Sequence, residues 1–309
     1  MATTQTLAIQ TAENKVFYDR VLIERMLPDL VYAEYGQKKS APKHEGDTIN
    51  FRKMNSLAPA LTPLTEGVTP VGNALTIATV TATVSQYGDF IQLSDKIATI
   101  GIDPIVTETV QIAGEQASLT IDTVNRDIIT AGTNVQYAGG KASRLLTAQA
   151  DIMTGTEIKK AVRTLRRQNA KEIKEGCFIG IMGPDVEFDI MSDAMWIDVA
   201  KYQNKEQLMK GEVGKLYGVK FIRTSNAKKF VGLGASGIDI NGTMIIGKNA
   251  YGVVDVNGSS KPETIVKAAG SAGTSDPLNQ ISTVGWKALF TAVRLNELAM
   301  VRIESSSSI

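Results

Sequence analysis

The sequence predicts an α+β fold, in which long amphipathic helices accompany extended strands distributed along the chain. Three observations predict this class. Apolar residues recur at spacings of three and four from 104 to 131, segments near both ends alternate apolar and polar side chains, and the middle of the chain alternates helical and strand patterns. With 309 residues, 43% of them hydrophobic, the chain can bury one large core or two smaller ones.

Charge and composition exclude several kinds of partner. The chain has 33 basic and 32 acidic residues, so its formal net charge of +1 creates no global field that attracts nucleic acid or anionic lipid. A net charge near zero also does little to oppose self-association. No segment approaches the roughly 20 consecutive apolar residues that cross a bilayer, and the first residues lack the features of a secretion signal. We therefore expect no membrane partner.

Side chains suited to catalysis are scarce. His44 is the only histidine and Cys177 the only cysteine, so one chain cannot assemble the usual zinc ligands or a disulfide framework. The string from Gly232 to Gly237 matches G-x-G-x-x-G, but the turn-rich residues 238–242 follow it where a dinucleotide site requires a helix. We expect a surface loop there. We also expect no enzyme activity and no catalytic, cofactor or metal site.

The first elements predict an arm followed by an extended excursion. Residues 13–35 carry apolar side chains at helical spacing, with an interruption at Pro28. Residues 48–53 and 75–84 have strand patterns, and the prolines between them predict a long hairpin with a stiffened tip. This tip is too thin to bury its own apolar side chains, which therefore need an outside surface. The residues concerned are Leu57, Leu61, Leu64 and Val68.

The longest predicted element is a helix from Pro104 to about Ala131, with one apolar stripe along about 40 Å of its length. Asp103 suits the N-cap position and Gly132 suits the end of this helix. Gly114 should destabilise the helix by about 1 kcal/mol unless close packing requires a glycine at that position.

The middle of the chain alternates helix and strand. Thr154 and Glu157 form a capping-box pattern for a helix with one apolar and one basic face, a strand follows at 178–182, and Pro184 opens a second helix. Aspartates recur every four residues in this second helix. They indicate either a solvated face or a face that pairs with a basic helix of a neighbouring subunit, with a metal site as a weaker third interpretation. The residues of that pairing are Asp185, Asp189 and Asp193 with Lys159, Arg163 and Arg167.

The last part of the sequence is rich in strand patterns. Short strands are predicted at 219–222, 243–246 and 251–256. In the alternating pattern from Val284 to Leu295, both faces become apolar after Lys287, which is typical of a central strand. A final strand at 301–304 and an early one at 86–93 are expected to join the sheet of this central strand.

Several short blocks of sequence follow one another in order along nearly the whole chain. They include EGDTINFR at 45–52, LTPLTEGVTP at 61–70, QYGDF at 86–90, GPDV at 183–186, DPLNQ at 276–280 and TVGWK at 283–287. This ordered series resembles a family of major capsid proteins of tailed bacteriophages. The family is similar to the Hong Kong ninety-seven-type shell fold.

The resemblance implies an architecture and a function. It implies an N-terminal arm (1–46), an extended loop (47–85), a peripheral domain (86–146 and 276–309) with a spine helix at 104–131, and an axial α/β domain (147–275). Such a chain is a major capsid protein, whose pentamers and hexamers form an icosahedral head shell around the double-stranded DNA genome. The hairpin tip would then rest on a neighbouring subunit.

The resemblance also implies partners and a location. The partners are other copies of the chain, a separate scaffolding protein, the portal, decoration proteins and packaged DNA bound without sequence specificity. The protein would be assembled in the host bacterial cytoplasm and located in the virion. The basic face of the helix at 156–168 either faces solvent or meets this DNA. Two alternative functions are the shell protein of a related nanocompartment and, on the glycine motif alone, a nucleotide-binding enzyme.

Overall fold

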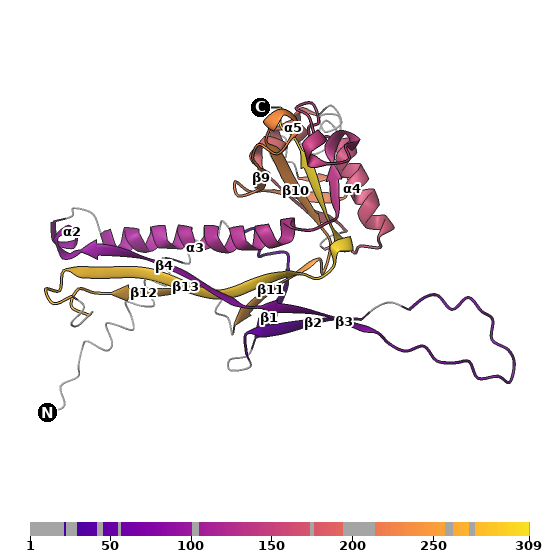
Figure 1. Ribbon diagram of the computed structural model, residues 1–309, viewed down its shortest axis with the longest axis horizontal. Helices are drawn as coiled ribbons and strands as arrows, with labels where there is room; N and C mark the ends of the chain where they lie inside the picture. Colours follow the sequence, from indigo (N-terminus) through magenta and orange to yellow (C-terminus); the bar gives the residue numbers. More distant parts are fainter. Residues whose placement is uncertain are drawn as a thin grey trace.

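The computed structural model describes residues 22, 30–41, 46–54, 57–100, 105–173, 176–193, 214–256, 262–271 and 276–308. Most of the helix predicted at 13–35 lies outside these residues, and so do His44 and the predicted N-cap Asp103. The molecule has a long flat body, a compact domain that stands on one end of this body, and a hairpin that projects beyond it (Figure 1).

The long body is a helix packed on a sheet. The short helix α2 (Asp95–Ile100) precedes α3 (Ile105–Thr130), so the predicted long helix is confirmed to within a residue at either end. Its buried stripe, which includes Val110 and Ala117, packs against β13. Gly114 lies against Leu22, whose carbonyl oxygen would be only 2.8 Å from a Cβ at that position. Close packing therefore requires the glycine.

The sheet under α3, called here the long sheet, has β13 at its centre. Its order is β1 (Gln37–Ala41), β11 (Tyr251–Val256), β13 (Ile281–Arg294) and β12 (Glu263–Lys267), and β4 (Ser85–Ser94) also pairs with β13. From Val284 to Ala292, every second side chain of β13, including Trp286 and Phe290, is buried. The predicted central strand is confirmed, and so is its pairing with the early strand near 86–93.

The compact domain has its own sheet and core. The order of this compact sheet is β5 (Val135–Tyr137), β14 (Met300–Ser305), β10 (Ile240–Ile246), β6 (Phe178–Met182), β8 (Val219–Arg223) and β7 (Lys215–Leu216), with β9 (Lys228–Phe230) also paired to β10. Helices α4 (Gly155–Arg167) and α5 (Pro184–Ser192) pack on it through Ile158, Leu165 and Val186. Short 3₁₀ turns are η2 (Ala138–Gly140), η3 (Arg144–Leu146), η4 (Ala235–Gly237) and η6 (Glu297–Ala299).

Strand pairing crosses the boundaries expected from the sequence. β11 and β12 fall within 147–275, yet they pair with β13 in the long sheet. The expectation that the final strand joins the sheet of β13 is wrong: β14 falls within 276–309 but lies between β5 and β10 in the compact sheet. The chain therefore passes between the two sheets several times, which a division at single residues does not capture.

Two local expectations have different outcomes. The capping box is wrong: the Thr154 side chain makes no cap hydrogen bond, and the Gly155 amide instead donates to Oδ2 of Asp193 over 2.6 Å. Glu157 accepts a hydrogen bond from Gln136. The glycine motif at 232–237 does form a loop between β9 and β10, without the helix that a dinucleotide site requires.

Candidate functional site

The hairpin is fixed to the body only at its base. Strands β2 (Thr48–Met54) and β3 (Ile77–Thr83) pair in antiparallel register. Ile49 and Phe51 point into a small core that includes Val254 of β11. The Phe51 ring leaves no room for a side chain at Gly252, because a Cβ there would lie 2.6 Å from the ring. The base of the hairpin is thus part of the subunit's own core.

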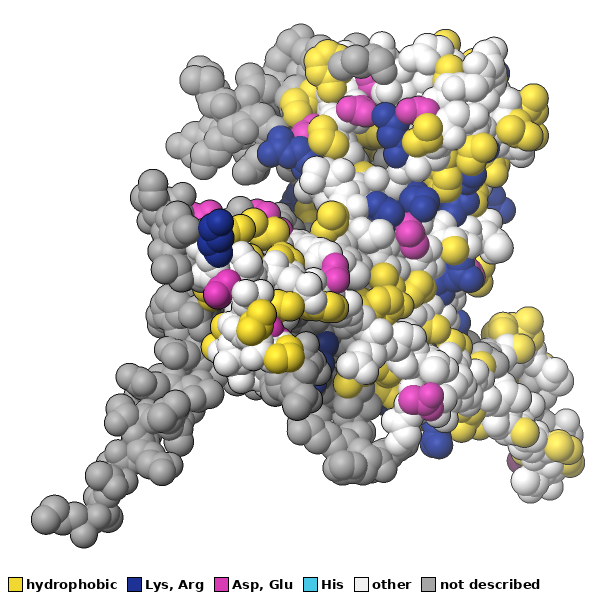
Figure 2. All heavy atoms as spheres, turned by 60° about the vertical axis from the view of Figure 1, so that its left-hand side comes forward, with side chains coloured by type: hydrophobic (Ala, Val, Ile, Leu, Met, Phe, Trp, Pro, Cys, Tyr) yellow, Lys and Arg dark blue, Asp and Glu magenta, His cyan; other side chains and the backbone are white. Residues whose placement is uncertain are grey.

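Beyond the strands, the apolar side chains of the tip have little cover from the described part of the chain. The four predicted contact residues are largely exposed, with exposed fractions of 56% for Leu57, 84% for Leu61, 78% for Leu64 and 62% for Val68. Burying such side chains is favourable by about 1.5–3 kcal/mol each. Figure 2 shows apolar side chains gathered on the projecting hairpin at the lower right. The geometry agrees with the expectation that these residues need an outside surface.

The long body carries exposed apolar side chains of its own. Ile112 and Leu119 lie seven residues apart on α3, about two helical turns, and are more than half exposed. Phe90 on β4 is 61% exposed. Exposed apolar side chains that form a contiguous patch mark surfaces available to a partner.

The three aspartates near α5 do not form one solvated row. Asp189 is buried and accepts hydrogen bonds from the amide and hydroxyl of Ser308. Asp185 lies 3.7 Å from Nζ of Lys229, and Asp193 follows the end of the helix and bonds the start of α4. Because these carboxylates already have partners within the chain, pairing across a subunit interface remains a prediction, and Asp189 is the least accessible to it.

The basic residues of α4 lie on its outer face, as expected. Lys159 lies with its Nζ 4.3 Å from the centre of the Tyr217 ring, a cation–π contact. Together with Arg163 and Arg167, it lines an open hollow on this face. The structure thus places these three cations together on one face of α4.

A polar junction that sequence patterns did not reveal joins the body, the arm and the compact domain. Oδ1 of Asp122, on α3, accepts hydrogen bonds from the amides of Val31 and Tyr32 at 3.0 and 2.9 Å. Burial raises the pKa of the Asp122 carboxyl, although these amides, Asn226 and Arg126 act in the opposite direction. No sequence signal distinguishes Asp122 from other polar residues of the helix, because its partners lie about 90 and 104 residues away.

The described residues provide little for metal binding. Among them, no group of three histidine, cysteine or acidic side chains is arranged to hold a metal ion. None of the helices in the described ranges is long and apolar enough to cross a membrane. Cys177 is buried and directly precedes β6.

Comparison with known proteins identifies the family in which this arrangement of a body, a compact domain and a projecting hairpin occurs. A family model described as phage capsid protein matches residues 77–303. The chain belongs to this phage capsid protein family. It is a structural protein of the virion, and the predicted family and function are confirmed. None of the curated proteins compared with the capsid protein matches it in sequence.

Solved structures of phage capsids share its fold. The capsid of Ralstonia phage GP4 has a TM-score of 0.71 at 14% identity, with 90% of this chain and 88% of that chain covered. The capsid of cyanophage P-SCSP1u has a TM-score of 0.68 at 14% identity, covering 90% and 89%. A virus-like particle from Pyrococcus furiosus is also similar, with a TM-score of 0.53 at 11% identity and 94% and 99% coverage. The predicted α+β capsid fold is therefore confirmed.

Proposed function

We propose that the capsid protein forms pentamers and hexamers that close into an icosahedral head around double-stranded DNA, and that the hairpin tip is its main assembly arm. The observation that carries this proposal is the exposure of Leu57, Leu61, Leu64 and Val68 on a segment held to the subunit only at its base. Modest contacts of this kind, repeated around a closed lattice, produce a stable particle because each additional contact is intramolecular within the assembly.

The surface that receives the tip lies on the body of a neighbouring subunit. Ile112 and Leu119 on α3 and Phe90 on β4 offer exposed apolar side chains for this contact. In this arrangement the long body is the peripheral domain, with α3 as its spine, and the compact domain is the axial domain near the capsomer centre. Charges of α4 and α5, among them Lys159, Arg163 and Asp185, then face adjacent axial domains.

The remaining partners follow from the same function. A separate scaffolding protein guides assembly in the host bacterial cytoplasm, the portal occupies one vertex, and decoration proteins bind the outside. The packaged DNA meets the inner face without sequence specificity. The subunit performs no catalysis, and it requires no cofactor.

Electron microscopy of the purified full chain tests this function. We expect rings, tubes or closed shells, produced with or without a scaffolding partner, and nuclease-protected DNA inside particles made during phage infection. Stable monomers or dimers under every salt condition would contradict shell formation. Particles that contain a specific protein cargo and no DNA would instead support the nanocompartment alternative.

A further inference from the structure

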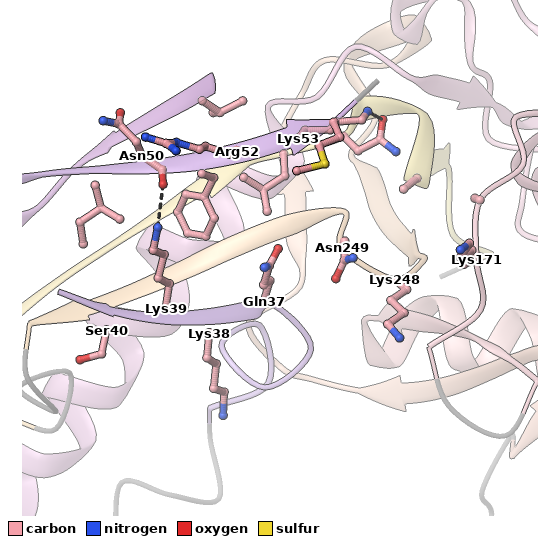
Figure 3. Close-up of a pocket in the computed structure, with 18 of the residues that line it drawn as sticks. Gln37, Lys38, Lys39, Ser40, Asn50, Arg52, Lys53, Lys171, Lys248 and Asn249 are labelled. Atoms are coloured by element: carbon pink, nitrogen blue, oxygen red, sulfur yellow. Dashed lines mark hydrogen bonds between the residues drawn. The ribbon is translucent and has the colours of Figure 1, made fainter. Parts of the chain in front are cut away.

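A basic groove of about 1190 Å³ lies between β1, the base of the hairpin and two loops of the compact domain (Figure 3). Six of its lining residues are cationic: Lys38, Lys39, Arg52, Lys53, Lys171 and Lys248. None of its described lining residues is acidic. In a chain whose net charge is only +1, this is a local concentration of positive charge.

Most of these cations lack an anionic partner. Lys39 donates to the main-chain oxygen of Asn50 over 2.7 Å, and Lys53 donates to Oδ1 of Asn296 over 3.1 Å. Within the described part of the chain, the other four cations form no ion pair or side-chain hydrogen bond. All six side chains are exposed. The groove therefore favours an anionic ligand, and none of the six cations is needed to hold the core together.

Among the strands that the structure describes, β2 pairs only with β3, so its other edge is unpaired and forms one wall of the groove. The amide of Val84 donates to the oxygen of Asp47, which marks these two residues as a hydrogen-bonded pair of the hairpin. Hydrogen-bonded pairs alternate along an antiparallel ladder, so the main-chain groups of Asn50 and Arg52 point away from β3. The bond from Lys39 to the oxygen of Asn50 agrees with this register.

The opposite wall is also a strand edge. Among the described strands, β1 pairs only with β11, so one of its edges is unpaired. Four consecutive residues of β1, Gln37 to Ser40, line the groove, and so do all seven of β2. Since neighbouring side chains of a strand point to opposite faces, consecutive residues line one groove only where it follows the edge of the strand.

We propose that this groove binds an extended, acidic polypeptide segment of a partner protein, which adds a strand to the free edge of β2. The main-chain groups of Asn50 and Arg52 would pair with the segment, as in other cases of strand addition. Lys38, Lys171 and Lys248 would bind its carboxylates. This site goes beyond the proposed assembly arm, because it uses the base of the hairpin and not its apolar tip.

A polynucleotide fits the groove less well. Phe51 is the one aromatic ring among the groove's described lining residues, and it is buried, so no exposed ring is available to stack a base. The unpaired main-chain donors and acceptors of β2 match a polypeptide, which supplies both kinds of group at the same repeat. Nucleic acid backbones supply acceptors but few donors.

The first test measures binding of a short peptide in which Glu and Val alternate, using the full-length protein. We expect binding that weakens with salt, and protection of the Asn50 and Arg52 amides from hydrogen exchange. A peptide with Lys in place of Glu should not bind. A Glu–Val peptide methylated at alternate main-chain nitrogens keeps its charge but cannot pair along a strand, so it should bind at least about tenfold more weakly.

Charge reversal locates the site. Lys171→Glu with Lys248→Glu should weaken peptide binding by about tenfold or more. The matched control is Arg163→Glu with Arg167→Glu on α4, which makes the same charge change away from the groove and should leave binding nearly unchanged. Equal losses in both double variants, equal binding of the methylated peptide, or tighter binding of single-stranded DNA than of the Glu–Val peptide would overturn the proposal. Shell formation is measured separately, so loss of peptide binding with normal shells distinguishes this site from the assembly arm.

Discussion

Asn226 donates a hydrogen bond from Nδ2 to Oδ2 of Asp122 over 3.0 Å, and this bond ties the compact domain to the middle of the long helix. Arg126, one turn further along α3, donates to the main-chain oxygen of Asn226 over 3.2 Å. Because the other carboxylate oxygen of Asp122 holds the amides of Val31 and Tyr32, one side chain joins three parts of the subunit. These polar contacts add to a buried apolar cluster, including Ile129 of α3, Tyr251 of β11 and Ile181 of β6, that also joins the compact domain to the body.

Removing the Asp122 carboxylate should destabilise the subunit. In Asp122→Ala, the amides of Val31 and Tyr32 and the side chain of Asn226 lose their acceptor, so we expect the free energy of unfolding to fall by about 2–3 kcal/mol. Denaturant unfolding of unassembled subunits measures this. The control Asp127→Ala removes a more exposed carboxylate paired with Lys228 and should cost less than about 1 kcal/mol. Equal losses of unfolding free energy would show that the contacts of Asp122 stabilise the subunit no more than the surface pair of Asp127 and Lys228 does.

The pH dependence of stability should separate the same two aspartates. Burial raises the pKa of Asp122, so its favourable contribution is fully present below the unfolded pKa of about 3.9 and is lost as the pH rises through the folded pKa. Burial also raises the pKa of Asp127, but hydrogen bonds from Lys228 and Arg126 lower it overall. The contribution of Asp127 is therefore present above the unfolded pKa and lost as the pH falls through the folded one.

Neutral variants isolate these two contributions. Between about pH 3.5 and pH 7, the stability of the parent relative to Asp122→Asn should decrease with rising pH, whereas its stability relative to Asp127→Asn should increase. Unfolding curves recorded across this range give both differences. Slopes of the same sign for the two variants would contradict the assignment.

Glu304 should be essential to the compact domain. It is fully buried on β14 and accepts hydrogen bonds from Arg144 at 2.6 and 2.7 Å and from Arg302 at 2.7 Å. Glu304→Ala leaves the buried Arg302 guanidinium without its counter-charge, so we expect a loss of about 3–5 kcal/mol in unfolding free energy. The surface pair of Glu263 and Lys287 is the control, and Glu263→Ala should cost less than about 1 kcal/mol. A small loss for Glu304→Ala would mean that water or another group replaces the carboxylate.

The hairpin tip should matter for assembly and not for folding. Replacing 57–71 with a short Gly-Ser linker removes apolar side chains that are exposed in the subunit, so the thermal unfolding temperature should change little. Shell formation, followed by electron microscopy and light scattering, should fail. Shells of normal size and yield would falsify the assembly arm, and collapse of the fold would show that the tip belongs to the subunit's own core.

A milder version of this experiment tests the apolar contacts themselves. Leu61→Ser with Leu64→Ser should lower shell yield by about tenfold or more, because each leucine forfeits about 1.5–3 kcal/mol of burial at every repeated contact. Thr62→Ser with Thr65→Ser changes the same segment without removing large apolar side chains, and it should leave shell yield near that of the parent. Similar yields for both double variants would remove the leucines from the interface.

The sequence by itself determined the elements whose signal is local. The apolar stripe along 105–130, the alternation from Val284 to Leu295 and the prolines of the hairpin tip each reflect a repeat of the backbone, so periodicity alone predicted helix, central strand and projecting segment. The exposed leucines of the tip were also predictable, because a two-stranded excursion has no interior. The ordered sequence blocks identified the family for the same reason, because recognising them requires no knowledge of which distant residues are in contact.

Only the tertiary structure decided which distant residues meet. The sheet to which β14 belongs, the capping of α4 by Asp193, the junction at Asp122 and the basic groove all depend on contacts between residues far apart in the chain. A hydrogen bond or an ion pair needs only one suitable atom on each side, so it leaves no periodic trace in the sequence. Its partners become known only when the backbone brings them within about 3 Å of each other.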